Sequence, residues 1–589
     1  MSRNQATLIL VLLMVGGLAL RLVGSASLLP HHPEPDTYIT RQSDWSDGEA
    51  SIGKYPLLLV AIDAAIPFGN PAEVHKSGPI EEHLASAAAP FVKTRRWFSI
   101  LSMLLVLSTY WIGRNFFRRP AAVFAAAIVA VHPLLIAYAN QARPHVPTAA
   151  LASLGVVFCL RALRTRRPAD LMLAGLGTSL AAAAFQSGVF ALGSLGFVVA
   201  VALWQRWPKA LQASAAVLAI VAGLLLWSYQ PKPAEDPQGP AAIAAEAQQA
   251  ATLVAHQESR EDGTSRLDAT GGTQLLGGSQ HRVYFHLFNG GGLLVLGRAL
   301  YSHAPLLMVL SILGALLCLS QLPGVVRRAR HGGAPRVLAL KLLTTAGYAG
   351  SFLLVFGIYA GSNERFFVAL LPYLALLAAA PLVRLADSRA LTATCLAIAL
   401  LILPLAVSSR IVWLRVQPDS FQVAANWLQR EAASQPKGTQ TSVFVGSFGF
   451  LPVLQANPHH LSGSVRKTSV WGRYLLNHKF KRTPLVMVYI KPFKQNFATL
   501  AEGKEAAAEV VGETDLAVIY AAKGLTKLGL VGQNVRQRGK LLFQTPNENP
   551  DARSMKYALG PQAFLDVWKI RHLGAPLEIY KLEPQTQGS

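Results

Sequence analysis

Long apolar stretches constrain this chain more than any other feature of its sequence. A helix of about 17–25 apolar residues crosses the hydrocarbon core of a bilayer, and we count eleven stretches of this kind. Because a backbone in lipid must satisfy its polar groups internally, each stretch is expected to be a helix. The predicted spans are residues 6–23, 97–113, 121–138, 144–163, 171–185, 188–204, 210–227, 304–325, 337–359, 366–383 and 390–407.

The fifth and sixth stretches, 171–185 and 188–204, allow two interpretations. Both are short, and only Gln186 and Ser187 separate them. They form either two spans or a single kinked or re-entrant element.

The composition agrees with a membrane protein. Of the 589 residues, 52% are hydrophobic and only 14% are charged, which is too apolar for an ordinary soluble protein. A net charge of +23 in a soluble chain would suggest nucleic acid as the partner. In a multi-pass protein this excess belongs in short cytoplasmic loops and beside lipid headgroups. We therefore expect membrane lipids and anionic substrates as partners, and no nucleic acid.

The N-terminus raises the question of a signal peptide, because a basic start precedes an apolar core. That core is long enough to span a bilayer, and Arg21-Leu22-Val23-Gly24 continues it without a clear cleavage site. We therefore predict a retained first span.

Basic residues in the short loops predict the orientation. All of them fall on one side if the N-terminus is cytoplasmic, and segments 24–96, 228–303 and 408–589 then lie on the outer face. This regularity supports an odd number of spans, because losing one would move the later loops to the other side. We expect a multi-pass protein of the cell (inner) membrane with an extracytoplasmic C-terminal domain. The loop residues are Arg114, Arg118, Arg119, Arg161, Arg164, Arg166, Arg167, Arg206, Lys209, Arg327, Arg328, Arg330, Arg336, Arg384 and Arg389.

The composition changes after the last span. We predict a transmembrane domain over residues 1–409, with outer loops 24–96 and 228–303, and a soluble α/β domain over residues 410–589. The second domain is of ordinary domain size. Its pattern predicts a helix at 420–433 and strands at 441–445, 485–490, 516–520 and 577–582. The expected fold class is mainly α: a polytopic helical bundle of about eleven spans with this α/β domain on the outer face.

Several kinds of chemistry have no sequence support. The chain contains no GxGxxG, P-loop, GxSxG or HExxH motif. The three cysteines, Cys159, Cys318 and Cys395, lie far apart with no CxxC spacing, which argues against structural zinc and a disulfide framework. No acidic pair of fixed spacing assigns a metal site, so cofactors and metal dependence stay open.

The first outer loop concentrates acidic residues beside the membrane. A carboxylate partly shielded from water at the end of a span can act as a general base toward a hydroxyl or amine. The alternative is a solvated acidic loop that caps a helix. The acids are Glu34, Asp36, Asp44, Asp47 and Glu49.

Two short motifs in this loop carry a resemblance to a known family. Pro35-Asp36-Thr37-Tyr38-Ile39 and Lys54-Tyr55-Pro56-Leu57-Leu58 resemble the first outer loop of the GT-C class of membrane glycosyltransferases. More specifically, they resemble that loop in bacterial relatives of protein O-mannosyltransferases and of the aminoarabinose transferase of lipid A. Further stretches resemble the family in the same order: 94–97, 110–114, 132–143, 363–367, 371–374, 424–428 and 577–582.

The resemblance implies a sugar donor linked to polyprenyl phosphate and an acceptor on the outer face, which is a protein, lipid or glycan. Asp36 is then the general base and Glu34 a supporting acid. Cationic groups at the outer boundary would stabilise the departing phosphate, and polar residues nearby would line the acceptor cleft. The phosphate-binding candidates are Arg143, Arg365, Lys54 and Arg96, and the cleft candidates are Tyr38, Tyr55, His145 and His286.

The chain departs from the family pattern at three positions. Thr37 follows Asp36 where an acid is common, His145 stands where many relatives have Asp, and Gln186 where Lys is frequent. Two other interpretations stay open. A transporter or flippase would show internal sequence repeats, of which we see none. A non-catalytic relative that acts as a scaffold or sensor is compatible with the departures.

Overall fold

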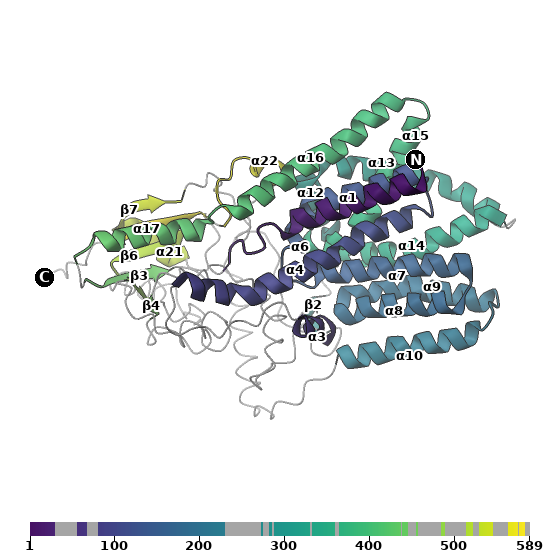
Figure 1. Cartoon of the computed structure of the whole chain (residues 1–589), viewed down its shortest axis with the longest axis horizontal. Helices are drawn as coiled ribbons and strands as arrows, with labels where there is room; N and C mark the ends of the chain where they lie inside the picture. Colours follow the sequence, from purple (N-terminus) through teal and green to yellow (C-terminus); the bar gives the residue numbers. More distant parts are fainter. Residues whose placement is uncertain are drawn as a thin grey trace.

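The computed structural model has a bundle of long helices at one end and a small sheet at the other (Figure 1). We use "sheet-facing end" for the end of the bundle that points toward the sheet. The structure describes residues 1–29, 56–66, 80–229, 272–274, 282–284, 288–329, 333–359, 364–436, 439–445, 455–456, 485–488, 514–521, 529–545, 563–574 and 576–582.

The bundle helices coincide with the predicted spans. In the described part of the chain, nine helices are long and apolar enough to cross a membrane, and the bent pair α5 and α6 makes a tenth. The shorter apolar helix α8 accounts for the remaining span, so the predicted polytopic bundle is confirmed. The helices are α1 (Arg3–Leu22), α4 (Ile80–Gly113), α5 (Arg119–Val131), α6 (Pro133–Ala139), α7 (His145–Thr165), α8 (Pro168–Ala184), α9 (Ala191–Trp204), α10 (Ala210–Ser228), α13 (Pro305–Ala329), α14 (Gly333–Ile358), α15 (Leu371–Ala386) and α16 (Ala390–Val416).

The fifth and sixth spans are separate helices. The chain is extended at Phe185 and then forms a 3-10 turn, η2 (Gln186–Phe190), before α9 begins. At Gly188 this turn touches the end of α8, since a Cβ there would lie 1.9 Å from the carbonyl oxygen of Ala181. Only glycine permits so close a reversal, and α8 and α9 consequently lie side by side (Figure 1).

The third span is broken in its middle. Helices α5 and α6 meet at an angle of 54°, at the His132-Pro133 step. Pro133 has no N–H group and so cannot donate to the carbonyl oxygen of Val129, which ends the helix there. The ring Nδ1 of His132 accepts a hydrogen bond from the backbone N–H of Leu134 at 3.2 Å and starts the new helix.

Side chains from other helices satisfy the carbonyl groups that the break exposes. Arg21 of α1 donates to the carbonyl oxygens of Val129 at 3.1 Å and Ala130 at 2.8 Å. Ser408 of α16 donates to that of Val131 at 2.7 Å. Since an unsatisfied carbonyl is costly at membrane depth, these contacts fix α1 and α16 against the break.

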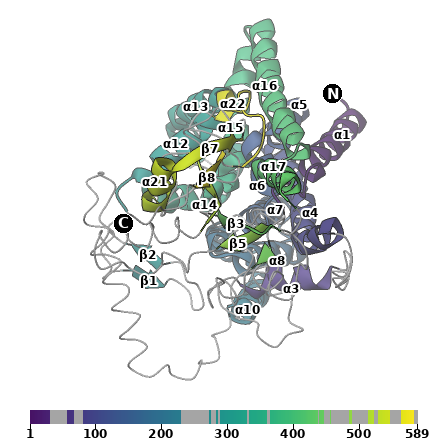
Figure 2. The same cartoon turned by 90° about the vertical axis from the view of Figure 1, so that its left-hand side faces the viewer.

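Two helices at the sheet-facing end were not among the predicted spans. They are α3 (Leu57–Ala65) and α12 (Gly291–His303), both too short to cross a bilayer. Helix α3 packs on α8 and α10 (Figure 2). A further 3-10 turn, η4 (Glu364–Leu370), leads into α15.

The C-terminal part contains a six-stranded sheet in the order β4-β5-β3-β6-β8-β7. Strands β4, β5, β3 and β6 are parallel, whereas β8 runs antiparallel to β6 and β7. The predicted helix and four predicted strands all occur, while β4 and β7 were not predicted. The elements are α17 (Ser420–Ser434), β3 (Thr441–Val445), β4 (Gln455–Ala456), β5 (Leu485–Val488), β6 (Leu516–Tyr520), α21 (Gly529–Arg538), β7 (Gly539–Gln544), α22 (Ala563–Asp566) and β8 (Leu577–Leu582).

Helix α16 joins the bundle to this region. Its side chain Arg410 donates to the carbonyl oxygens of Val567 at 3.3 Å and Ile570 at 2.8 Å. Apolar residues of α16, among them Ile411 and Leu414, pack against the same segment and against Leu28. The C-terminal region is therefore attached to the bundle through the end of α16.

Candidate active site

Six of the ten predicted site residues lie outside the described residues. The other four are Arg96 on α4, Arg143 in the turn between α6 and α7, His145 at the start of α7 and Arg365 in η4. The six outside are Glu34, Asp36, Tyr38, Lys54, Tyr55 and His286.

Arg143 and His145 lie where the broken third span passes into α7. Helix α6 ends at Ala139, and the chain turns back so that the N–H of Arg143 donates to the carbonyl oxygen of Gln141 at 2.8 Å. His145 is the first residue of α7. Only 7% of each of these two side chains is exposed. Two basic residues, both largely shielded from water, thus lie where the chain passes from α6 into α7.

Aromatic contacts bring this turn to η4 and to the end of α8. The His145 ring lies edge-on between Phe185, 5.0 Å away, and Phe366, 4.7 Å away. Phe366 directly follows Arg365, whose guanidinium carbon lies 5.5 Å from the centre of the Phe366 ring. The structure therefore brings the segments of Arg143, His145 and Arg365 together.

A hydrogen bond makes a second link between the same segments. The hydroxyl of Tyr138, at the end of α6, donates to Oε1 of Glu364 at 2.5 Å. Sequence reasoning assigned a role to Arg365 and none to Glu364, although an acid at the edge of an apolar span is itself a signal. The turn and η4 are thus joined by a polar and an aromatic contact.

Arg365 has an unused donor. Its Nε is buried, and within the described part of the chain it has no hydrogen-bond partner. A buried donor without an acceptor is costly, and a guanidinium group suits the oxygens of phosphate or carboxylate. This atom is therefore a candidate for binding an anionic ligand.

Arg96 occupies a different environment. It is exposed, whereas its neighbours Thr94, Arg95 and Trp97 on α4 are buried. Sequence reasoning chose Arg96 and overlooked Arg95. Nη1 of Arg95 donates to the carbonyl oxygens of Ser25 at 2.8 Å and Ser27 at 2.9 Å. Helical periodicity places residues 94 and 97 on one face of α4, but it does not by itself tell which of residues 95 and 96 is buried.

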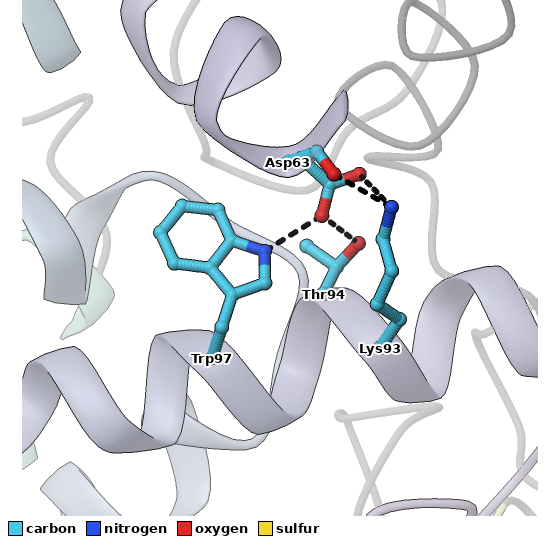
Figure 3. A network of polar contacts seen from close by, with 4 residues as sticks. All are labelled: Asp63, Lys93, Thr94 and Trp97. Atoms are coloured by element: carbon cyan, nitrogen blue, oxygen red, sulfur yellow. Dashed lines mark hydrogen bonds and ion pairs between the residues drawn. The ribbon is translucent and has the colours of Figure 1, made fainter. Parts of the chain in front are cut away.

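A buried carboxylate lies beside the middle of α4. Asp63 of α3 is fully buried, and its Oδ1 accepts hydrogen bonds from Thr94 Oγ1 at 2.8 Å and Trp97 Nε1 at 2.6 Å. Lys93 Nζ lies 3.7 Å from Oδ2 and donates to the carbonyl oxygen of Asp63 at 2.6 Å (Figure 3). Sequence reasoning missed Asp63, although it is an acid inside an apolar stretch. Among the described residues, no group of three or more His, Cys, Asp and Glu side chains is placed to hold a metal ion.

Comparison with known proteins identifies a related family. Residues 92–227, from α4 to α10, match the family model described as dolichyl-phosphate-mannose-protein mannosyltransferase. No curated protein matches the chain. Over residues 92–227 the match confirms the predicted resemblance to relatives of protein O-mannosyltransferases, and the long apolar helices are those of a multi-pass membrane protein.

Solved structures show weak similarity over most of the chain. The archaeal oligosaccharyltransferase AglB from Archaeoglobus fulgidus is 12% identical, with a TM-score of 0.48 over 92% of this chain and 73% of that one. ArnT from Cupriavidus metallidurans is 12% identical, with a TM-score of 0.40 over 98% of each chain. Both TM-scores lie below 0.5, so the similarity is weak.

Proposed function

We propose that this chain transfers a sugar from a polyprenyl-phosphate donor to an acceptor at the sheet-facing end of the bundle. The observation that carries the proposal is the unused buried donor of Arg365, held against the turn that bears Arg143 and His145. The family-model match from α4 to α10 supports the reaction class. Arg143 and Arg365 are the proposed phosphate ligands, with Lys54 and Arg96 as further cations.

The proposed chemistry needs a base and a stabilised leaving group. Asp36 accepts the proton of the acceptor hydroxyl as the acceptor oxygen bonds to the sugar carbon. The bond from that carbon to the phosphate oxygen breaks, and polyprenyl phosphate departs with its negative charge stabilised by the two arginines. Glu34 supports Asp36. The acceptor cleft is assigned to Tyr38, Tyr55, His145 and His286.

Orientation and domain division belong to the same proposal. The short loops predicted to carry the basic residues include the end of α9 and the start of α14, and at this end of the bundle Arg336 lies 5.0 Å over the ring of Trp204. By the positive-inside rule that end is cytoplasmic, so the proposed site faces the outer side of the inner membrane. The proposed domains are 1–409 and 410–589, and the acceptor is a protein, lipid or glycan.

The proposal is tested by supplying purified protein with labelled polyprenyl-phosphate sugars. We expect the wild type to transfer label and Asp36→Asn to reduce transfer by a factor of about 10² or more, because general-base catalysis contributes on that order. The matched control is Asp387→Asn, which removes an exposed carboxylate near the opposite end.

Two outcomes would overturn the proposal in different ways. Unchanged transfer by Asp36→Asn removes Asp36 from the mechanism. A wild-type protein that transfers no label from any donor, but moves a lipid-linked or anionic substrate across reconstituted vesicles, supports the transporter instead.

A further inference from the structure

Three basic side chains gather where α7 ends, α9 ends and α14 begins, at the end of the bundle away from the sheet (Figure 1). The guanidinium carbon of Arg336 on α14 lies 5.0 Å from the centre of the Trp204 ring at the end of α9. Further along α14, Lys341 lies close enough to Arg164, in the last turn of α7, for the two positive charges to repel each other. We call Arg164, Arg336 and Lys341 the basic patch.

The helices that carry the basic patch pack closely on one another. A Cβ on Gly193 of α9 would lie 2.4 Å from the carbonyl oxygen of Gly347 on α14. Beside this contact, Ser194 Oγ donates to the carbonyl oxygen of Thr344 at 2.6 Å. Leu340, which precedes Lys341, packs against an apolar cluster that includes the end of α7. The backbones that carry the three cations are therefore fixed relative to one another.

No acid in the described part of the chain forms an ion pair with the basic patch. Among the described residues from α5 to α14, Asp170 is the only acid. Its carboxylate is already used, because Oδ1 forms an ion pair with Arg161 Nε at 2.8 Å and Oδ2 accepts a hydrogen bond from Thr165 Oγ1 at 2.6 Å. Charged side chains at membrane helices are costly unless they are paired, so the basic patch requires an anion from outside the chain.

An anionic phospholipid matches the basic patch in charge and in position. A guanidinium group binds phosphate oxygens through its N–H edge, which stacking on an aromatic ring leaves free. The surface beside the cations is apolar, because Trp204 is 71% exposed and Val337 is 45% exposed on helices apolar enough to cross a membrane. Acyl chains can pack on such a surface, whereas a free phosphate ion cannot use it. Basic pockets between membrane helices bind lipid headgroups in this way.

We propose that Arg164, Arg336 and Lys341 bind the phosphate of an anionic phospholipid whose acyl chains lie along α9 and α14. The lipid bridges α7, α9 and α14, so its binding stabilises the packing of these helices. This site lies at the opposite end of α7 from His145. It is separate from the proposed transfer site and does not depend on the proposed function.

Lipid titration of the purified protein tests the proposal. In native mass spectrometry, we expect the wild type to bind phosphatidylglycerol more tightly than phosphatidylcholine, and phosphatidylglycerol should also raise its unfolding temperature. Each cation beside an anionic headgroup contributes about fivefold in affinity. Arg336→Gln should therefore weaken phosphatidylglycerol binding about fivefold. The triple variant Arg164→Gln, Arg336→Gln and Lys341→Gln should weaken it about 100-fold.

A matched control removes the same charge from other short loops. Arg118, Arg384 and Arg389 are exposed, and changing all three to glutamine should leave phosphatidylglycerol binding nearly unchanged. Arg336→Lys keeps the charge and should retain most of the affinity. Should the triple variant fail to fold, Arg164→Gln alone changes an exposed side chain and should still weaken binding about fivefold.

Three results would overturn the proposal. Equal losses of phosphatidylglycerol affinity in the triple variant and in its control would show a general attraction to headgroups and no site. Equal binding of phosphatidylglycerol and phosphatidylcholine by the wild type would show that the headgroup charge is not recognised. If inorganic phosphate alone stabilises the wild type as strongly as phosphatidylglycerol does, the basic patch binds a soluble anion and not a lipid.

Discussion

The guanidinium of Arg21 donates a hydrogen bond to the carbonyl oxygen of Ala130 at 2.8 Å, directly at the break between α5 and α6. Arg21 is completely buried, although it lies on a helix whose other side chains are mostly exposed to the surroundings of the bundle. An arginine at this depth is costly unless it is paired or hydrogen-bonded. Here Arg21 donates hydrogen bonds to backbone carbonyl groups that the helix break at Pro133 exposes.

We expect Arg21→Gln to destabilise the protein, because the shorter side chain cannot serve both Val129 and Ala130. Each buried carbonyl that loses its donor costs about 1–3 kcal/mol. The measurement is thermal unfolding of purified protein in detergent. Arg3→Gln, at an exposed position of the same helix, is the control, and equal unfolding temperatures for both variants would contradict the assignment.

Replacing Pro133 with alanine is expected to compensate in part for the loss of Arg21. Alanine restores an N–H group that can donate to Val129 and lets α5 continue. In a double-mutant cycle, Arg21→Gln combined with Pro133→Ala should therefore cost less than the sum of the single variants. Additive effects would show that the proline and the arginine are independent.

Gly188 is expected to tolerate no side chain. An added Cβ would lie 1.9 Å from the carbonyl oxygen of Ala181, so Gly188→Ala must push η2 away from α8. We expect lower thermal stability and lower yield, with a cost of about 1–3 kcal/mol as for other overpacked sites. Gly196→Ala, on α9 with nothing within 4 Å of the new atom, should be neutral.

Arg365→Gln is expected to weaken donor binding. A charge-assisted hydrogen bond contributes about 1.5–3 kcal/mol, which corresponds to a rise in KM for the polyprenyl-phosphate donor of about 10-fold or more. Arg327→Gln removes an equal charge elsewhere and should leave KM unchanged. If KM does not change in Arg365→Gln while transfer persists, another cation binds the phosphate.

Single cysteines test the orientation. In a protein lacking its native cysteines, Ser43→Cys and Ser464→Cys should react with an impermeant maleimide added to the outside of intact cells. Ser388→Cys, exposed in the turn between α15 and α16, should react only after the membrane is opened. Labelling in the reverse order would invert the proposed topology.

The spans were predictable because apolarity is a local property of the sequence. The sequence left open whether the stretches 171–185 and 188–204 are two spans or one. The close contact between Gly188 and the carbonyl oxygen of Ala181 reverses the chain between them, so they are two helices. The limits of α4 were missed because Lys93, Arg95 and Arg96 interrupt its apolar pattern. Their charges belong to a helix that continues beyond the predicted span to Ile80.

The candidate site was only partly predictable. The sequence selected Arg143 and Arg365 from their place at the ends of spans and His145 from its position in the family pattern, and the structure puts their segments together. It did not indicate Glu364 or Asp63 as site residues. The Tyr138–Glu364 contact spans 226 positions of the chain, and the Thr94–Asp63 contact spans 31.

The sequence by itself determined a mainly helical membrane protein, because hydrophobicity acts residue by residue in a bilayer. Only the tertiary structure decided which polar side chains are buried and what they bind. Arg95 and Arg96 are adjacent and chemically identical, but one bridges Ser25 and Ser27 and the other is exposed. That difference depends on which neighbouring segment packs against α4, and no local pattern contains it.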